Sequence, residues 1–509
     1  MFYVKSELEL LEAIYFHTEY EISLPYFETP GIASDTPLEL VNTDITPRNG
    51  KFLLVNPQVA TWCFINEREH RVCRLMGSPI QFSALEKATD PTVPPGWLEQ
   101  FLTHLYRRGM LKVNGKVGID PGMYAKGPIF RDTYLMELLL TERCNLQCEY
   151  CFAEAGSKRA DMPLEIGRKA IDKLLDLPCE RFILKLGGGE PFLRFGLIRE
   201  LVEYVEKRIA DREKPTGVLL ESTTNGTVLT DEMVDFIKRY RIRFCVSLDG
   251  PKDIHDRMRP FPGGRGSYEE TLKGIEKLKE HEVEFRVITV VARHNFDQAR
   301  RILDHLVSLG ITLVRFNPMV KTGSGRSEWD RNGIEPKEYF SFMGEVLEYL
   351  GENRCLSEDN LERMIRNLVV RTRDTNCMRS LCGAGYTHIT VDPEGDLHPC
   401  ALLRSSTRHI RQGNINSIES LMTCYANDPV VKEMPRRVVR NIPGCRECVW
   451  RHFCEGGCTL SALADYGTLY HPTSLCEYYR RMYPYLLDYL AEHPEVAAYL
   501  VSEAEICRY

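Results

Sequence analysis

The sequence predicts an α/β protein built on a partial (β/α)6 barrel, with a winged-helix-like α+β domain before it and a cysteine-rich domain after it. Three observations support this prediction. Between residues 134 and 317, six apolar runs of β type alternate with amphipathic helical segments. Polar or glycine-rich motifs follow the first four of these runs. Eleven of the 18 cysteines fall into two groups with metal-like spacing.

The composition is that of a globular protein, with 43% hydrophobic and 27% charged residues. The formal net charge of −7 is spread along the chain without a basic tail, which argues against a nucleic-acid partner. We find no apolar run long enough to span a bilayer, and the first residues lack the order of a signal peptide. We therefore expect a cytoplasmic protein without a membrane partner. In the reducing cytoplasm, structural disulfides are disfavoured.

Residues 1–125 are expected to form a separate α+β domain. Residues 51–56 and 60–66 have strand patterns, and residues 96–106 repeat apolar side chains at helical spacing. Gly109 then ends the helix before a short strand, an order typical of winged-helix domains. Such a domain either packs against its neighbours only or binds a peptide that adds a strand to its sheet. The residues of this region leave both alternatives open.

The barrel, expected over residues 130–320, has its unusual residues on the loops that follow its strands. The predicted strands cover 134–140, 182–186, 217–220, 242–248, 285–292 and 312–317. In barrels of parallel strands, reactive groups collect at this rim. The rim candidates are Cys144, Cys148, Tyr150, Cys151, Gly188, Gly189, Glu190, Asn225 and Ser247. Three thiolates on one loop can bind three corners of an iron–sulfur cluster, and the loop alone also permits a zinc half-site.

The second cysteine group is expected in a domain at residues 377–480, after a helical linker at 321–376 and before a helical tail at 481–509. The turn at 392–396 lies between two β-like runs and predicts a hairpin with Cys400 on its return strand. The group comprises Cys377, Cys382, Cys400, Cys445, Cys448, Cys454, Cys458 and Cys476. Eight thiolates suffice for two four-cysteine sites, occupied by iron–sulfur clusters or by zinc.

The rim motifs of residues 130–320 resemble those of the radical S-adenosylmethionine (radical SAM) enzymes. The resemblance implies that Cys144, Cys148 and Cys151 hold a [4Fe–4S] cluster whose open iron binds SAM. It further implies that Gly188 and Gly189 approach the methionine part of SAM, that Glu190 accepts a hydrogen bond from its ammonium, and that Tyr150 lies near its adenine. Asn225 and Ser247 match positions that border the cofactor.

Residues 377–476 resemble the SPASM extension of radical SAM enzymes that modify peptides. By that resemblance, Cys382, Cys400 and Cys458, together with Cys377, bind a first auxiliary [4Fe–4S] cluster. Cys445, Cys448, Cys454 and Cys476 bind a second, so that the chain carries three clusters in all. If Cys377 is not a ligand, one iron of the first auxiliary cluster is open to a substrate thiolate.

These resemblances imply a maturase of a ribosomally made precursor peptide. A 5′-deoxyadenosyl radical would remove hydrogen from the peptide, and a crosslink, with a thioether as first choice, would follow. The N-terminal domain would bind the leader of the peptide, and flavodoxin or ferredoxin would donate electrons. Carbon–carbon or carbon–oxygen crosslinking, maturation of a whole protein such as a sulfatase or a quinone-cofactor dehydrogenase subunit, and a non-catalytic scaffold are the alternatives.

One departure from a related group bears on the mechanism. The anaerobic sulfatase-maturing enzymes carry an aspartate directly after the second cysteine of the extension, where this chain has Ala401 after Cys400. An oxidation that depends on that base is therefore less expected here. Asp249, His255 and Asp256 have ordinary structural explanations, and no general acid or base is assigned.

Overall fold

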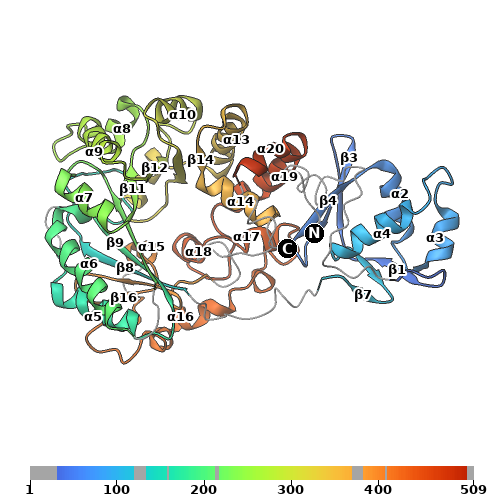
Figure 1. Cartoon of the computed structure of the whole chain (residues 1–509), viewed down its shortest axis with the longest axis horizontal. Helices are drawn as coiled ribbons and strands as arrows, with labels where there is room; N and C mark the ends of the chain where they lie inside the picture. The colour runs from blue at the N-terminus through green and yellow to red at the C-terminus, as the bar shows by residue number, and fades with distance from the viewer. Residues whose placement is uncertain are drawn as a thin grey trace.

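A computed structural model describes residues 31–119, 133–156, 160–212, 217–369, 382–406 and 410–500. Its centre is a mixed sheet with the strand order β14-β13-β12-β11-β10-β9-β8-β15-β16. Figure 1 shows the barrel and the small N-terminal domain at opposite ends of the long axis, with helices α19 and α20 between them. Among the described helices, none is long and apolar enough to cross a membrane.

Six parallel strands form the partial barrel, which confirms the predicted fold class. They are β8 (Thr133–Thr141), β9 (Arg181–Gly188), β10 (Gly217–Thr224), β11 (Arg243–Ser247), β12 (Phe285–Val291) and β13 (Leu313–Pro318). Their outer face is covered by α5 (Leu164–Leu175), α6 (Phe195–Ala210), α7 (Asp231–Arg239), α9 (Tyr268–Glu280) and α10 (Ala299–Ser308). Parallel strands need such crossover helices, and the helices bury the apolar outer face of the sheet.

Helix α7 illustrates how the sequence produces these covering helices. The Thr230 hydroxyl accepts a hydrogen bond from the backbone N–H of Met233, which caps the first turn. Acidic residues occupy the first turn and basic residues the last, so the charges complement the helix dipole. Val234 and Ile237, three positions apart, are both fully buried against the barrel.

The sheet continues beyond the six barrel strands at both edges. At one edge, β14 (Ser357–Glu358) pairs with β13. At the other edge, β15 (His388–Val391) runs parallel to β8 and forms the predicted hairpin with β16 (Leu397–His398). The hairpin of the cysteine-rich domain is therefore part of the barrel sheet, with β15 between β8 and β16. Cys400, expected on the return strand, lies two residues beyond the end of β16.

The segment expected as a linker, 321–376, contains α11 (Ser324–Ser327), α12 (Trp329–Asn332), α13 (Pro336–Asn353) and α14 (Asp359–Val369). Helices α13 and α14 pack in the main core against α19 (Cys476–Glu492) and α20 (Pro494–Leu500). This part of the chain therefore has a packing role as well as a connecting one.

Within residues 31–119, the N-terminal domain has two small sheets and three helices. Its strands are β1 (Pro37–Leu40), β2 (Asp44–Arg48), β3 (Lys51–Asn56), β4 (Thr61–Ile65), β5 (Ile80–Gln81), β6 (Leu111–Val113) and β7 (Lys116–Val117), and its helices are α2 (Glu67–Leu75), α3 (Phe82–Ala88) and α4 (Trp97–Arg107). Asn66 and Glu69 form a capping box at the start of α2. The predicted strands and helix of this domain are present.

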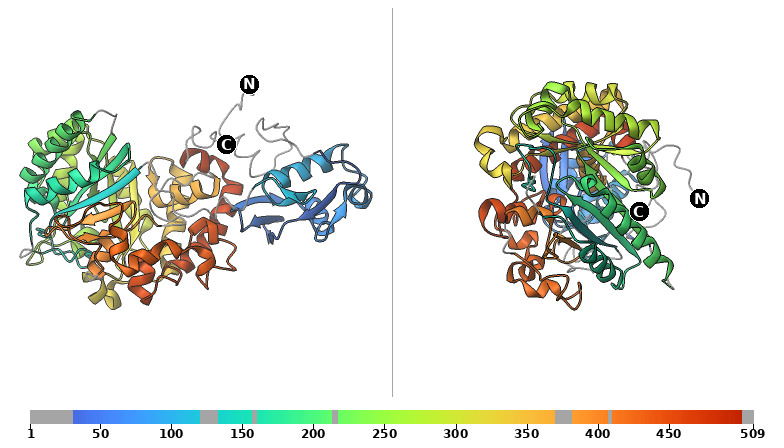
Figure 2. Two further views of the ribbon diagram at one scale, coloured as in Figure 1. Left: turned by 90° about the horizontal axis from the view of Figure 1, so that it is seen from below. Right: turned by 90° about the vertical axis from the view of Figure 1, so that its left-hand side faces the viewer.

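Both faces of the β3–β4 pair are buried, but against different cores. Leu54, Cys63 and Ile65 face the core of the N-terminal domain, whereas Leu53 and Trp62 belong to the main core that contains α14 and α19. The Trp62 indole N–H donates a hydrogen bond of 3.0 Å to the Leu368 carbonyl at the end of α14. Figure 2 shows the blue strands of this sheet meeting the red and orange helices. The domain is thus packed onto the rest of the chain through β3 and β4.

We expect the Trp62→Ala substitution to lower the free energy of unfolding by about 3–5 kcal/mol, because it removes a fully buried indole and its hydrogen bond at this interface. Trp97→Ala is the matched control, since Trp97 is only partly buried within the N-terminal domain itself. Chemical denaturation of both variants measures the difference. A loss for Trp62→Ala no larger than that for Trp97→Ala would contradict the proposed interface.

Candidate active site

The three-cysteine loop and the glycine-rich loop are held together by backbone pairing. Strands β8 and β9 are paired up to Thr141 and Gly188, and beyond them Gly189 N–H donates to the Thr141 carbonyl (2.8 Å) and Glu190 N–H to the Arg143 carbonyl (2.9 Å). A Cβ atom on Gly188 would lie 2.3 Å from the Thr141 oxygen, and one on Gly189 would lie 2.2 Å from the Arg143 oxygen. The two glycines are therefore required by the neighbouring backbone of the cysteine loop itself.

Glu190 lies behind this rim, fully buried. Its carboxylate accepts hydrogen bonds from the Thr224 hydroxyl (2.7 Å), the Asn225 backbone N–H (2.7 Å) and the Phe192 backbone N–H (3.1 Å). Burial raises its pKa to about 7, against the effect of these three donors. The side chain braces the β9 and β10 loops against each other, whereas Gly188, Gly189, Asn225 and Ser247 line the cavity in front of it.

Asn225 connects the β10 loop to the cysteine loop. Its side-chain amide donates to the Asn145 side-chain oxygen at 2.9 Å and lies 3.8 Å from the Cys144 sulfur. The backbone N–H of Leu146 also points at that sulfur, at 3.4 Å. Burial raises the pKa of this thiol, and the two donors partly oppose that effect by stabilising the thiolate, the form that ligation of a metal requires.

Tyr150 is fixed by a buried ion pair. Its hydroxyl donates to the Asp249 carboxylate, which also pairs with Arg259 at 3.1 Å, and the Arg259 guanidinium lies 5.1 Å from the centre of the Tyr150 ring. Asp249 has no exposed surface; burial raises its pKa, but Arg259 and His255 hold it below the ordinary value. Arg259 and Asp249 thus position an aromatic ring that borders both the cysteine loop and the cavity.

The three cysteines of this loop are half-buried and lie beside one another. Burial raises the pKa values of Cys144 and Cys148 to about 12, so cluster binding must displace their protons. Among the described residues, no group of His, Cys, Asp or Glu side chains is arranged for a single metal ion. Three thiols around a cavity, with no fourth protein ligand among them, fit a cluster with one open iron better than a zinc ion.

The downstream cysteines gather in two places. Cys382, Cys400 and Cys458 pack against one small core formed by residues such as Ala384 and Leu460. Cys445, Cys448, Cys454 and Cys476 line a second small pocket. This grouping, which crosses the chain order, is the one that the SPASM resemblance implies. Cys377 lies outside the described residues.

Arg437 lies between these two groups and is almost fully buried. Its guanidinium donates to the carbonyls of Leu469, Gly456, Gly457 and His471 at 2.7 to 3.3 Å. Burial lowers its pKa, although the cysteines of both groups act in the opposite direction. Sequence reasoning missed this arginine, because a lone basic residue in a basic stretch carries no distinctive signal.

A single large cavity, of about 1660 Å³, connects the three-cysteine loop with the downstream cysteines. Its wall includes Cys144, Cys148 and Cys151 on one side and Cys400, Cys458 and Cys476 on the other. Tyr150, Ser247 and Asn225 also border it. Ligand pockets usually measure about 300–1,000 Å³, so this cavity has room for more than one small molecule.

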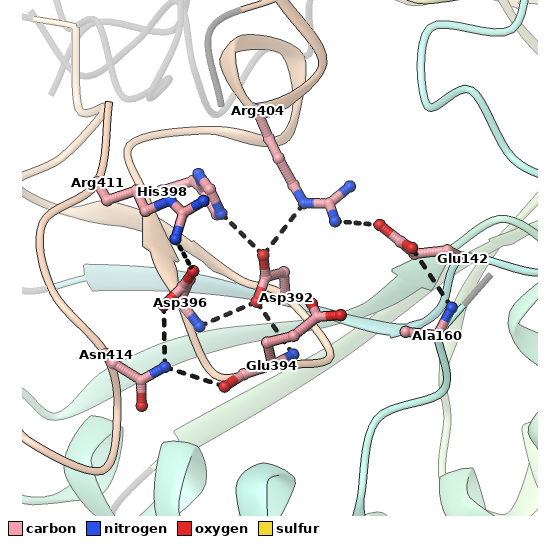
Figure 3. A network of polar contacts seen from close by, with 9 residues as sticks. All are labelled: Glu142, Ala160, Asp392, Glu394, Asp396, His398, Arg404, Arg411 and Asn414. Atoms are coloured by element: carbon pink, nitrogen blue, oxygen red, sulfur yellow. Dashed lines mark hydrogen bonds and ion pairs between the residues drawn. The ribbon is translucent and has the colours of Figure 1, made fainter. Parts of the chain in front are cut away.

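A buried ionic network joins the first cysteine loop to the β15–β16 hairpin (Figure 3). Arg404, in α15 (Ala401–Ser406), pairs with Glu142 of the cysteine loop and with Asp392 of the hairpin, the latter at 3.4 Å. Asp392 also pairs with His398 at 3.0 Å, two residues before Cys400. The network therefore ties together the two loops that carry Cys144 and Cys400.

We expect Arg404→Met to lower the free energy of unfolding by about 3–5 kcal/mol, because it leaves two buried carboxylates without their cation. Adding Glu142→Gln should recover at least about 1 kcal/mol of that loss in a double-mutant cycle. Arg411→Met, which breaks the more exposed Arg411–Asp396 pair, should cost less than about 1 kcal/mol. Equal losses for Arg404→Met and Arg411→Met, measured by urea denaturation, would contradict the role of Arg404.

Comparison with known proteins gives two family matches. The Radical SAM superfamily matches residues 138–322, and SPASM, an iron–sulfur cluster-binding domain, matches residues 382–449. The subtilosin biosynthesis protein AlbA of Bacillus subtilis is 28% identical over 67% of this chain and 69% of its own length.

Two solved structures share the fold. Native anSMEcpe with bound S-adenosylmethionine has a TM-score of 0.61 at 19% identity, over 71% of this chain and 99% of that chain. Streptococcus suis SuiB bound to precursor peptide SuiA has a TM-score of 0.53 at 16% identity, over 88% of this chain and 99% of that chain. The solved structures support the fold, and the two family matches identify the chain as a radical SAM enzyme that carries a SPASM domain after its barrel.

Proposed function

We propose that this enzyme binds a ribosomally made precursor peptide and installs an intramolecular crosslink in it. The observation that carries the proposal is the cavity of about 1660 Å³ that reaches from the three-cysteine loop to Cys400 and Cys458. After SAM is bound at the rim, such a volume leaves room for a peptide segment between the two cysteine groups. The similarity to AlbA and the shared fold with SuiB, both over much of the chain, support a peptide substrate.

Each part of the rim has a role in this proposal. Cys144, Cys148 and Cys151 would hold a [4Fe–4S] cluster, which with SAM would supply the radical chemistry that removes hydrogen from the peptide. The backbone at Gly188 and Gly189 would border SAM, and Glu190 would act on its ammonium indirectly, by holding the loops after β9 and β10 in place. The Tyr150 ring would lie beside the adenine of SAM. Its orientation is fixed by the hydrogen bond from its hydroxyl to Asp249, which is itself paired with Arg259.

The downstream cysteines hold the two auxiliary clusters in this proposal. Cys382, Cys400, Cys458 and Cys377 bind the first, and Cys445, Cys448, Cys454 and Cys476 bind the second. Because Cys400 and Cys458 line the same cavity as the rim, an electron acceptor there would lie beside the bound peptide. A thioether is our first candidate for the new bond, with carbon–carbon and carbon–oxygen bonds as alternatives. Flavodoxin or ferredoxin supplies the electrons.

The N-terminal domain binds the leader of the precursor in this proposal. Its two small sheets offer edge strands to which an extended peptide can add. Because β3 and β4 are packed against α14 and α19, a leader held there would lie beside the helices that join this domain to the barrel. Deleting the whole domain is a poor test, since the deletion would remove Trp62 and expose the surface of α14 that Trp62 and its neighbours cover.

We expect Cys148→Ala to abolish 5′-deoxyadenosine formation and crosslinking, with a loss of about a third of the iron, because one of three clusters is lost. The assay is anaerobic reaction with SAM, a reductant and the peptide encoded beside the gene, followed by mass spectrometry. Alkylation of the product tells a thioether from the other bonds, since a crosslinked cysteine no longer reacts. Cys355→Ala, at an exposed cysteine outside both groups, is the control. Activity that survives in Cys148→Ala would refute the assignment.

Cys377→Ala tests whether the first auxiliary cluster is fully bound by the protein. If Cys377 is the fourth ligand, we expect the variant to lose part of its iron and to show an altered cluster signal in electron paramagnetic resonance, because one iron loses its thiolate. The radical SAM cluster should be unaffected, so 5′-deoxyadenosine formation without peptide should persist. Unchanged iron content and an unchanged signal would mean that this iron is open.

A further inference from the structure

One wall of the barrel cavity is charged, and none of the motifs discussed above accounts for it. Six side chains that point into the cavity come from six neighbouring strands, β8 to β13. Together with Asp359, which pairs with two of them, we call them the charged wall. The six side chains are Glu137, Lys185, Glu221, Arg243, Arg286 and Arg315. Strand register aligns the first four in one row of alternating sign, from Glu137 to Lys185, Glu221 and Arg243.

Each cation of the charged wall has a carboxylate partner that is more deeply buried than itself. Lys185 pairs with Glu137 at 2.8 Å, and their side chains are 32% and 7% exposed. Arg243 pairs with Glu221 at 3.3 Å, with 59% and 25% exposed. Arg286 and Arg315, at 26% and 29%, share Asp359, at 11%. Glu137 and Glu221 also line the cavity, but in each pair the cation is the more exposed member, so positive groups dominate the accessible part of the wall.

The charged wall also has one cation more than it has carboxylates. Arg286 reaches one oxygen of Asp359 at 2.7 Å, and Arg315 donates to the same oxygen. The Nε atom of Arg286 is buried without a hydrogen-bond partner in the part of the chain that the structure describes. The nearby Glu358 carboxyl is fully buried and accepts hydrogen bonds from the backbone of Phe316 and Leu361. It faces away from the cavity.

Packing alone does not explain this arrangement. Ion pairs in a protein interior cost desolvation energy, and apolar side chains of similar size would close a barrel as stably or more stably. In addition, Arg243 lies only four residues before Ser247 of the rim, about 13 Å along the strand. The charged wall is therefore within reach of a peptide segment of a few residues that enters the cavity at the rim.

We infer that the charged wall binds a carboxylate of the substrate, with Arg286 and Arg315 as the principal donors. This inference rests on the proposed function and specifies its substrate: the segment that enters the barrel carries an acidic residue close to the site of modification, or ends in a free carboxylate. Guanidinium groups suit such a ligand, because they donate paired hydrogen bonds to the two carboxylate oxygens.

The test measures binding and needs no turnover. Full-length enzyme loaded with clusters and SAM is mixed anaerobically with a library of capped, amidated decapeptides that differ at one central position. Ultrafiltration and mass spectrometry measure which members are retained. We expect Glu and Asp members to be retained about tenfold over Gln and Asn members. A second library, whose peptides end in a free C-terminus, separates a side-chain carboxylate from a terminal one. If the terminal carboxylate is bound, every peptide of the second library should be retained more than its amidated counterpart.

Two substitutions should change this preference in opposite directions. Arg286→Gln leaves the Arg315–Asp359 pair in place and should bring retention of Glu and Gln members close to equality. Asp359→Asn frees both arginines and should increase the preference for Glu. Arg239→Gln, on the exposed face of α7, is the matched control and should change nothing.

Several outcomes would overturn the inference. These are equal retention of Glu and Gln members in the amidated library together with no higher retention of the library with a free C-terminus, no retention of any member, or a preference that both variants leave unchanged. The proposed function is judged separately by 5′-deoxyadenosine formation and by the mass of the product. A preference for acidic peptides without crosslinking would therefore refute the proposed function but still support carboxylate binding by the charged wall.

Discussion

The site depends on one set of backbone hydrogen bonds, those between the end of β8 and the loop after β9. They hold the cysteine loop against the glycine-rich loop so closely that a Cβ at Gly188 or Gly189 would overlap carbonyl oxygens. Glu190 then anchors the β10 loop, and Asn225 reaches back toward Cys144. The rim is thus a closed ring of contacts in which each loop fixes the next, and the thiols are placed before any cluster is bound.

The same sheet connects the two cysteine-bearing parts of the chain. Because β15 pairs with β8, the hairpin that leads to Cys400 continues the barrel, and Arg404 bridges the corresponding loops with a buried charge. Long-range pairing of this kind is costly in chain entropy and contributes only once both partners are folded. The barrel and the cysteine-rich domain are therefore expected to fold as one cooperative unit, with the cysteines brought together as a consequence.

Much of the fold could be predicted from the sequence, because its signals are local. The alternation of apolar runs and amphipathic segments located all six barrel strands, and the turn at 392–396 located the hairpin. What could not be predicted is long-range. No periodicity indicates that β15 joins β8, that both faces of β4 are buried, or that the strands of the barrel point a row of charges inward.

For the site, cysteine spacing and the rim motifs indicated the residues, but not always the physical reason for them. Gly188 and Gly189 were expected for their approach to a ligand, yet neighbouring backbone already requires them. Glu190 was expected at the ligand and lies behind the lining residues. Arg259, Arg404 and Arg437 escaped functional assignment, because a buried arginine is recognised by its partners, and those lie far away in the sequence.

Trp62 belongs to the N-terminal domain but is buried in the main core of the protein, and this has a consequence for protein engineering. Recognition modules at the N-terminus invite exchange between enzymes, as a way to redirect one catalytic core to new precursors. A junction drawn in the connecting segment would carry β3 and β4 with the incoming module and leave α14 facing foreign side chains. A workable chimera would keep the inward face of Leu53, Val55, Trp62 and Phe64, and graft only the parts of the module that face solvent.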